Sequence, residues 1–176
     1  HYDLGNEFYR MWLDDRMVYT CAYYNTPSAS LADAQVAKLD HVCRKLDLQP
    51  GQDVIEAGCG WGALALHMAE FYGVKVSAYN ISEPQLAWAR ERAADRTLGE
   101  RVHFIQDDYR NIHQSCDRFV SVGMLEHVGR ANYQTLGRVV DRCLKPEGLA
   151  LIHSIGRSHP RKTDAWIRKY IFPGGH

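Results

Sequence analysis

The chain has 176 residues, of which 45% are hydrophobic and 24% charged, and its 21 basic side chains balance 21 acidic ones. This length predicts one domain with an adequate core, and the zero net charge argues against a nucleic-acid partner. No apolar run approaches the length of a membrane span, and no signal-peptide pattern is present. The five cysteines are far apart and form no C-x-x-C pair, which argues against a disulfide framework or a metal site and favours a cytoplasmic protein.

The first part of the chain is expected to be mainly helical. Leu4, Phe8, Met11 and Trp12 fall at helical spacing, with Asn6 as a candidate cap. The favoured interpretation is a helix that faces the core, and the alternative is an apolar lip over a site or a surface that touches lipid. A second helix follows, and its expected capping box pairs a serine with an aspartate three residues later, Ser30 and Asp33.

The rest of the chain alternates strands with helices. Continuous apolar runs predict strands over 54–57, 74–79, 102–106, 118–123 and 149–153. Between them we expect a helix over 63–72, one over 82–96 with Ser82 as cap and Gln85 as its box partner, one over 133–144, and a turn over 145–148. This order predicts a doubly wound, mostly parallel sheet with helices on both faces, whose ligands lie beyond the carboxyl ends of the strands.

The stretch 54–63 is the most informative part of the sequence. It predicts a buried strand, a tight turn made by Gly58, Gly60 and Gly62, and a helix whose free N–H groups face that turn. The glycine spacing fits the dinucleotide fingerprint, and with Glu56 it also fits the acidic pattern of S-adenosylmethionine (SAM) methyltransferases. A dinucleotide site also needs an acid about 20 residues further on, where this chain has Asn80. A turn without any ligand stays open as the third interpretation.

Seven stretches in order carry a family resemblance that runs nearly from end to end. The chain resembles the cyclopropane-fatty-acyl-phospholipid synthases, which include the mycolic acid cyclopropane synthases. The matching stretches are His1–Asn6, Tyr19–Tyr23, Gly58–Gly62, Gln106–Arg110, Ser121–Gly129, Leu151–Gly156 and Lys169–Pro173.

The resemblance implies a Rossmann-like SAM-dependent methyltransferase fold with a short helical N-terminal segment. Residues 1–49 would cover the active site and residues 50–176 would form the SAM-binding core. The chain begins at His1 and stops inside a turn signal, so we expect a fragment that lacks the C-terminal strands.

The implied reaction converts the methyl group of SAM into the methylene bridge of a cyclopropane across a cis double bond of a phospholipid acyl chain. A cationic intermediate must be kept from water, and in this family a bound bicarbonate is thought to take the leaving proton. The resemblance implies that four catalytic residues hold the bicarbonate: Cys21, Glu126, His153 and Ile155, the last through its backbone. Glu126 would accept the bicarbonate O–H, and His153 would donate to the ion or relay the proton.

The resemblance also implies the SAM contacts. Glu56, Gly58, Cys59, Gly60 and Gly62 would carry the cofactor. Tyr19 and Thr20 would close over it, while Asn80, Ile81 and Gln85 would meet the ribose, and Asp108 and Tyr109 would frame the adenine. Trp61 and His127 are interpreted as packing residues.

Partners and alternatives follow from the same resemblance. We expect an unsaturated phospholipid at the membrane surface as substrate, a peripheral position on the inner face of the membrane, and a homodimer. Related carbon methylation, giving methyl-branched or methoxy lipids or another methylated small molecule, is the second hypothesis. A binding module without chemistry is the third, and the presence of Cys21, Glu126 and His153 argues against it.

Overall fold

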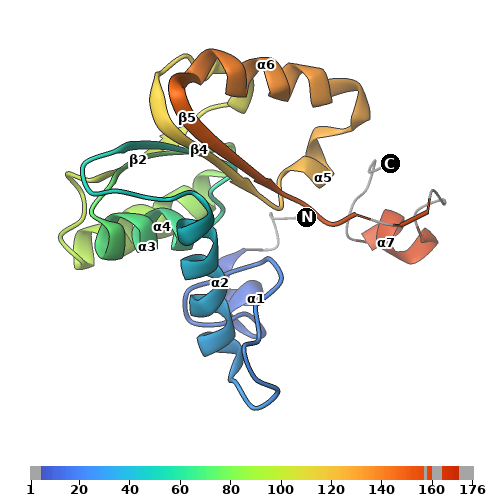
Figure 1. Cartoon of the computed structure of the whole chain (residues 1–176). Helices are drawn as coiled ribbons and strands as arrows, with labels where there is room; N and C mark the ends of the chain where they lie inside the picture. The colour runs from blue at the N-terminus through green and yellow to red at the C-terminus, as the bar shows by residue number, and fades with distance from the viewer. Residues whose placement is uncertain (1–4, 157, 160–163, 171–176) are drawn as a thin grey trace.

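The computed structural model describes residues 5–156, 158–159 and 164–170 (Figure 1). Their strands form one parallel sheet in the order β3-β2-β1-β4-β5. The strands are β1 (Asp53–Ala57), β2 (Lys75–Asn80), β3 (Val102–Gln106), β4 (Cys116–Val122) and β5 (Leu144–His153). The helices are α1 (Asn6–Arg10), α2 (Leu31–Lys45), α3 (Ala63–Tyr72), α4 (Glu83–Asp95), α5 (Leu125–Val128), α6 (Tyr133–Cys143) and α7 (Ala165–Tyr170), with the 3-10 turns η2 (Tyr109–Asn111) and η3 (Arg130–Asn132).

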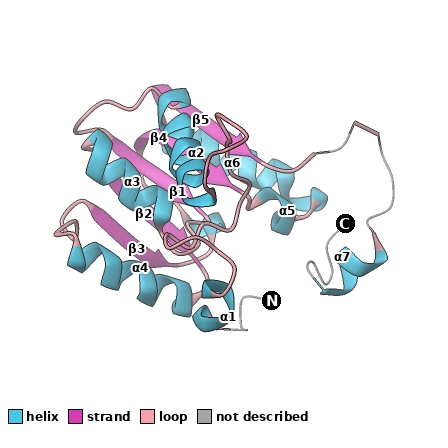
Figure 2. Cartoon of the chain, turned by 90° about the horizontal axis from the view of Figure 1, so that it is seen from below, coloured by secondary structure: helices cyan, strands magenta, loops and turns pink. Residues whose placement is uncertain are grey.

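Helices cover both faces of the sheet, so the predicted fold class is confirmed. α3 and α4 lie on one face and α6 on the other (Figures 1 and 2). Side chains alternate along each strand: Val54 joins the core under α2, α3 and α4, whereas Ile55 and Ala57 join the core under α6. Glu56 shares the face of Val54, and this places a carboxyl group among apolar side chains. None of the described helices is long and apolar enough to cross a bilayer.

The strand order reverses beside β1. From β1 the chain moves outward through β2 to β3, and then returns to place β4 on the other side of β1. In sheets of this kind the diverging connections leave a crevice at the carboxyl ends of the two central strands. The segments that follow β1 and β4 are therefore the ones that can build a site.

The α1 segment departs from the prediction. Leu4, the expected start, lies outside the described residues, and α1 spans only 6–10. Asn6 does not cap it, because Gly5 occupies that position with φ 83°. The Asn6 side chain instead accepts a 2.8 Å bond from Trp61 Nε1 and donates to the Pro84 carbonyl at 3.2 Å. Asn6 thus bonds to Trp61, which is distant in the sequence, and does not cap its own helix. This contact ties α1 to the glycine turn.

The two expected capping boxes have different outcomes. The box at α2 is confirmed, since Ser30 Oγ accepts from the Asp33 N–H at 3.1 Å. The box at α4 is wrong: Ser82 makes no side-chain cap, and Gln85 Oε1 accepts from Asn80 Nδ2 at 2.7 Å. Asn80 Oδ1 also accepts from the N–H groups of 81 and 82. An asparagine turn has taken over the start of α4.

The expected turn over 145–148 is also wrong. Pro146 and Gly148 lie inside β5, which begins at Leu144 and pairs with Cys116 before its register shifts. β5 is at the edge of the described sheet, where a proline removes no ladder bond that the sheet needs, and the irregularity accommodates it. The strand therefore continues through residues whose local preference is a turn.

Arg118 joins α2 to the sheet. Arg118 is 8% exposed, and its guanidinium donates from Nε to the Leu46 carbonyl at 2.5 Å and from Nη2 to the Asp47 carbonyl at 3.2 Å. These carbonyls end α2 and would otherwise be without helical partners. A cation there also interacts favourably with the helix dipole. The position of α2 is thereby set by β4.

A buried histidine in α3 predicts acid sensitivity. His67 is 4% exposed, and neither ring nitrogen has a hydrogen-bond partner within the described part of the chain. Burial lowers its pKa from 6.5, with Arg16 and Arg96 acting in the same direction and Asp40 and Glu70 opposing them. The folded state therefore takes up a proton on His67 only at a lower pH than the unfolded state does. The stability that depends on neutral His67 is complete above pH 6.5 and declines as the pH falls below it.

We expect the wild-type protein to lose more thermal stability than a His67→Leu variant when the pH is lowered from about 7.5 to about 5.5. His103, which is exposed, provides the control, and His103→Gln should behave as wild type. Equal losses of Tm in wild type and His67→Leu would contradict this origin of the acid sensitivity.

Candidate functional site

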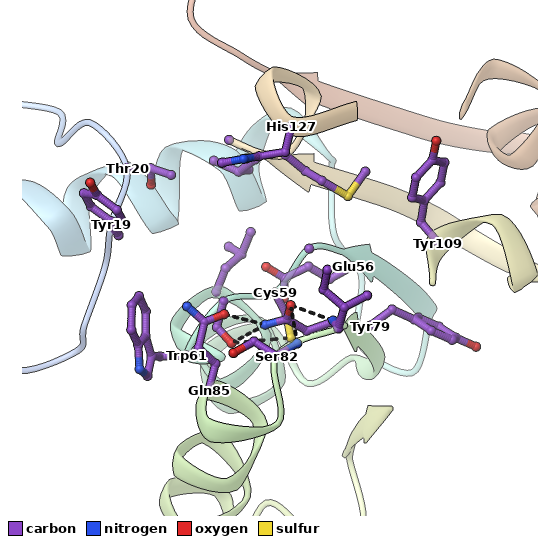
Figure 3. Close-up of a pocket in the computed structure, with 18 of the residues that line it drawn as sticks. Tyr19, Thr20, Glu56, Cys59, Trp61, Tyr79, Ser82, Gln85, Tyr109 and His127 are labelled. Atoms are coloured by element: carbon purple, nitrogen blue, oxygen red, sulfur yellow. Dashed lines mark hydrogen bonds between the residues drawn. The ribbon is translucent and has the colours of Figure 1, made fainter. Parts of the chain in front are cut away.

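A cavity of about 750 Å³ opens where the strand order reverses. Its wall is built by the 17–20 segment, by α2, by the glycine turn after β1, and by the segments that follow β2, β3 and β4. In Figure 3, Tyr19 and Thr20 lie across the cavity from Cys59 and Trp61, and His127 lies above them. Among the sequence-predicted SAM residues, eleven line this cavity: Tyr19, Thr20, Glu56, Gly58, Cys59, Gly60, Asn80, Ile81, Gln85, Asp108 and Tyr109.

The glycines of the turn are needed for different physical reasons. Gly58, Gly60 and Gly62 all have positive φ, at 83°, 54° and 80°. A Cβ on Gly62 would lie 2.7 Å from the Phe104 ring and 2.8 Å from the Ala89 Cβ, so this glycine lets α3 approach its neighbours. A Cβ on Gly60 would meet nothing within 4 Å. Gly60 therefore keeps space in the cavity, whereas Gly62 is absent from the lining and serves the packing below it.

Asn80 and Gln85 support the turn from the side of β2. Asn80 Nδ2 donates to the Gly60 carbonyl at 3.1 Å as well as to Gln85. Gln85 is 3% exposed, and its Nε2 is buried without a hydrogen-bond partner in the described structure. The amide group of Gln85 thus keeps a donor for a further acceptor, while Asn80 is largely engaged by the protein.

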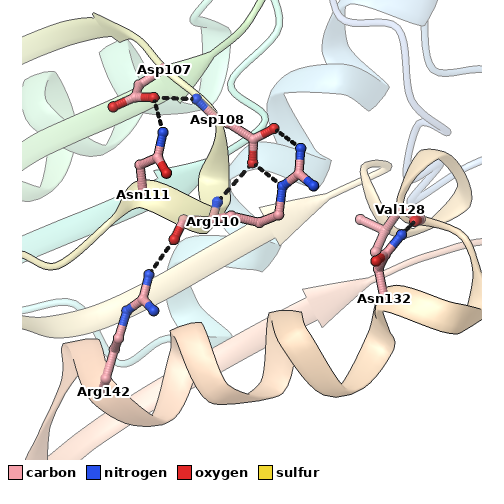
Figure 4. Close-up of polar contacts among 7 residues, drawn as sticks. All are labelled: Asp107, Asp108, Arg110, Asn111, Val128, Asn132 and Arg142. Carbon is pink, nitrogen blue, oxygen red and sulfur yellow. Dashed lines mark hydrogen bonds and ion pairs between the residues drawn. The ribbon is translucent and has the colours of Figure 1, made fainter.

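The segment after β3 is held by charged side chains (Figure 4). Arg110 donates to both carboxylate oxygens of Asp108, at 2.8 and 2.7 Å, and this lowers the Asp108 pKa. Asp107 Oδ1 accepts from the Asp108 N–H and from Asn111 Nδ2, each at 2.7 Å. Arg142 of α6 donates to the Ile112 and Arg110 carbonyls and fixes the whole turn. Asp108 therefore lines the cavity with its charge already paired.

The 17–20 segment packs directly on the sheet. Thr20 Cγ2 lies where a Cβ on Gly123 would be only 2.7 Å away, and Gly123 has φ +70°. Gln35 Nε2 of α2 donates to the Thr20 carbonyl at 2.8 Å. Tyr19 contacts Tyr9 and Trp12, with ring centroids 5.6 and 5.1 Å apart. These contacts hold a loop with no regular structure in place over the cavity.

One acidic and one basic side chain are buried at the floor of the cavity. Glu56 is 3% exposed and Lys38 of α2 is 7% exposed. Burial raises the pKa of Glu56 to about 8, against the lowering effects of Lys38 and a hydrogen bond from the Ala65 N–H. Burial lowers the pKa of Lys38 to about 8, against Cys21, Glu56 and Asp14. Lys38 Nζ donates to Thr20 Oγ1 at 2.8 Å, and Glu56 Oε2 is buried without a partner among the described residues.

The four residues implied for catalysis form two pairs. Cys21 Sγ lies 3.8 Å from His153 Nε2, and the Ile155 N–H donates to Glu126 Oε1 at 2.6 Å. Glu126 lines the cavity, whereas Cys21, His153 and Ile155 do not. Within the described residues, Glu126 Oε2 and His153 Nδ1 are buried and have no hydrogen-bond partner. One carboxylate oxygen and one ring nitrogen thus remain available at the carboxyl ends of β4 and β5.

Lys38, Trp61 and His127 line the cavity although sequence reasoning gave Lys38 no role and treated the other two as packing. A signal for Lys38 was present in the sequence. It lies four residues after Ala34 and four before Val42, so the helical period places it in the middle of the buried stripe of α2. A lysine there is rarely buried without a partner.

The cavity fits a SAM-sized ligand on structural grounds. Its volume falls in the range typical of small-molecule sites. Gly60 leaves open space, Gln85 keeps a buried donor, and Glu56 keeps a buried acceptor. The N-terminus of α3 also faces the turn. Donors, acceptors and space are thus combined at one end of the sheet.

The sheet is parallel, its strand order reverses beside a glycine turn, and a cavity lies at the reversal. This is the Rossmann-like fold of SAM-dependent methyltransferases, and solved structures of this class share it. Within that class, the chain belongs to the mycolic acid cyclopropane synthetase family, whose model matches residues 1–176. The resemblance inferred from the seven sequence stretches is therefore confirmed.

Individual relatives agree with this assignment. The chain is 48% identical over 176 residues to the cyclopropane-fatty-acyl-phospholipid synthase of Escherichia coli, covering 99% of this chain and 45% of that protein. It is 40% identical over 183 residues to a Pseudomonas putida protein named "Probable fatty acid methyltransferase", covering 99% of this chain and 46% of that one. The chain thus spans a little under half the length of these two relatives.

A solved relative shows the same architecture. The mycolic acid cyclopropane synthase CmaA1, crystallised with SAH and CTAB, superposes with a TM-score of 0.87 at 32% identity, covering 98% of this chain and 59% of that one. The structural similarity extends over nearly all of the chain.

Proposed function

We propose that the protein is a SAM-dependent cyclopropane synthase that acts on a cis double bond in a phospholipid acyl chain. The observation that carries the proposal is the pairing of Cys21 with His153 and of Ile155 with Glu126, the last of which lines a cavity that fits SAM. The family membership, the identity to the E. coli synthase and the SAH in the CmaA1 structure support it.

When bound, SAM would supply the methyl group that becomes the bridging methylene. The chain's own residues would hold it: the glycine turn beneath, Tyr19 and Thr20 above, Asn80, Ile81 and Gln85 at the ribose, and Asp108 with Tyr109 at the adenine. Apolar side chains of the same wall, including Met17, Val122 and Met124, would keep water from the reacting carbons. An alkene is a weak nucleophile, so holding the two reactants in line is the main contribution of this wall.

A bicarbonate held by the two pairs would be the proton acceptor. Glu126 Oε2, which has no hydrogen-bond partner among the described residues, provides an acceptor for the bicarbonate O–H, and the imidazole of His153 provides a group that can take up a proton. Cys21 serves as a weak donor beside His153, and the Ile155 N–H keeps Glu126 in position. Residues 1–49 would cover the site.

A membrane surface is the proposed place of action. α1 and the turn that follows it expose Phe8, Met11 and Trp12 at 39%, 75% and 43%, and α7 exposes Trp166 and Tyr170 at 60% and 53%. Exposed aromatic and long apolar side chains on short helices suit the boundary between lipid headgroups and acyl chains. We propose peripheral binding to the inner face of the membrane from the cytoplasm, in a homodimer.

The test is direct. Purified protein is incubated with SAM and vesicles of dioleoyl phospholipid, and the acyl chains are examined by mass spectrometry. We expect a gain of one methylene with loss of the alkene signal, and a slower rate when bicarbonate is depleted. The P. putida relative favours a second candidate, fatty-acid C-methylation, for which a methyl group is gained and the alkene is retained. Absence of any transfer to lipid would contradict both.

A further inference from the structure

A second, much smaller cavity lies beside the first and shares Trp61 with it. Its volume is about 10 Å³, which is room for one water-sized group. Three half-buried arginines line this recess: Arg16 from the segment that follows α1, and Arg92 and Arg96 from the end of α4. Guanidinium groups are strong donors to phosphate and carboxylate oxygens. The recess therefore favours a negatively charged oxygen.

The sequence of α4 brings the side chains of the recess to one face of the helix. Trp88, Arg92 and Arg96 follow one another at intervals of four residues, which places them on the same side of a helix. The Trp88 ring has two guanidinium neighbours, with Arg10 Cζ of α1 5.4 Å and Arg92 Cζ 5.1 Å from its centroid. α1 lies beside α4 in Figure 2. Stacking on Trp88 thus holds Arg92 at the recess and brings α1 next to it.

Two of the three charges at the recess have no ion-pair partner within the described part of the chain. Arg96 pairs with Glu70 at 2.9 Å. Arg92 donates to the backbone carbonyl of Asp15, which is a neutral acceptor. Arg16 has neither a hydrogen-bond nor an ion-pair partner among the described residues. Half-buried cations without a counter-ion are costly to keep, and an anionic ligand would offset that cost.

Exposed apolar side chains lie on the same side as the recess. Phe8 and Trp12 have ring centroids 6.0 Å apart, and both are exposed, as is Met11. Arg10 lies between Phe8 and Trp12 in the sequence and stacks on Trp88, so this apolar patch begins beside the recess. Cationic and apolar side chains together fit the boundary between the phosphate groups and the acyl chains of a membrane. A soluble anion would make use of the charges alone.

We propose that Arg16, Arg92 and Arg96 form a site for the phosphate group of an anionic membrane phospholipid. One phosphate oxygen would enter the recess and the rest of the headgroup would stay outside, since the volume admits no more. This inference rests on the proposed function, because it takes the membrane as the place of action. It adds a selection among lipids, since the protein would bind preferentially to negatively charged bilayers.

Vesicle sedimentation tests the site. The purified protein is mixed with vesicles of dioleoylphosphatidylcholine, either alone or in equal parts with dioleoylphosphatidylglycerol. We expect tighter binding to the anionic vesicles. Arg16→Gln should weaken that binding about fivefold, the effect of one cationic side chain near an anionic surface, and the double variant Arg16→Gln/Arg92→Gln about 25-fold. On phosphatidylcholine alone the losses should be smaller, so the preference for anionic vesicles should fall in both variants.

Arg138→Gln is the matched control, since it removes an exposed arginine of α6 that is not part of the recess, and it should bind both kinds of vesicle as wild type. Equal losses in Arg138→Gln and Arg16→Gln would reduce the effect to general charge attraction and overturn the site. If the double variant does not fold, Arg16→Gln decides the question, because it removes no hydrogen bond of the described structure.

Inorganic phosphate, titrated into wild type and Arg16→Gln, distinguishes a soluble ligand from a lipid. Phosphate binding that Arg16→Gln abolishes, together with unchanged vesicle binding, would assign the recess to a soluble phosphate and overturn the lipid as its occupant. Unchanged binding of Arg16→Gln to anionic vesicles, with normal methyl transfer by wild type, would overturn the site and leave the proposed function standing. Wild-type protein that binds neither kind of vesicle would instead overturn the proposed place of action.

Discussion

Replacing Glu126 by glutamine is expected to lower kcat about 10²- to 10⁴-fold, the range for loss of an acid–base group. The glutamine oxygen can still accept the 2.6 Å bond from the Ile155 N–H, so the local geometry survives. The other end of the side chain changes from the buried acceptor Oε2 to an NH₂ donor. The variant would then be unable to accept an O–H from the proposed bicarbonate.

Two measurements separate this role from a structural one. S-adenosylhomocysteine affinity by titration should match wild type, while the initial rate of methyl transfer to dioleoyl vesicles falls. The matched control is Glu100→Gln, which changes an exposed glutamate outside the cavity and should keep full activity. Wild-type turnover in Glu126→Gln would remove this residue from the mechanism.

Alanine substitutions at Gly60 and Gly62 are expected to differ in which property they damage more, the stability of the fold or the affinity for the ligand. Gly62→Ala places a Cβ 2.7 Å from Phe104 and 2.8 Å from Ala89, at a φ that L-residues rarely adopt. Overpacking costs about 1–3 kcal/mol and the left-handed backbone about 1–2 kcal/mol, so we expect about 2–5 kcal/mol of destabilisation. Gly60→Ala meets no neighbour, so only the backbone contribution of about 1–2 kcal/mol applies.

Ligand affinity should follow the reverse order, with the larger loss in Gly60→Ala. The new methyl group of Gly60→Ala would occupy cavity space, and we expect the folded variant to lose S-adenosylhomocysteine affinity at least about tenfold. Urea unfolding gives the stability of each variant, and titration below the unfolding transition gives the affinity. If Gly60→Ala binds as wild type, or if the two variants are equally destabilised, the division between a ligand-facing and a packing glycine is wrong.

Much of the fold could be predicted because its signals are local. Buried parallel strands are continuous apolar runs, and Ser30 and Asp33 form their box across only three residues of the chain. The failures have non-local or competing causes. Asn6 pairs with Trp61, 55 residues away. Gln85 bonds to Asn80 and does not form a capping box with Ser82. Pro146 and Gly148 are drawn into β5 by pairing with β4.

The candidate site was predicted in a different way. The resemblance supplied the residues, and the carboxyl-edge rule predicted that segments after β1 and β4 would meet. Sequence patterns could not show which polar atoms already have a hydrogen-bond or ion-pair partner. Asp108 is paired with Arg110, and Asn80 is committed to the backbone, whereas Glu56, Gln85 and Glu126 keep buried atoms without partners in the described structure. Lys38 was missed because a lysine in a helix usually lies on a solvated face, although its spacing from Ala34 and Val42 placed it in the buried stripe.

Arg118 has a consequence for the order of assembly. Its bond to the Leu46 carbonyl spans 72 residues, so α2 lacks this anchor until β4 has been synthesised and has joined β1. Contacts of such sequence separation form late, because the chain between them must first lose its freedom. α2 carries Gln35 and Lys38, and these hold Thr20 over the cavity. During synthesis, the N-terminal wall of the site would therefore be completed only after the central strands have paired, although its residues leave the ribosome first.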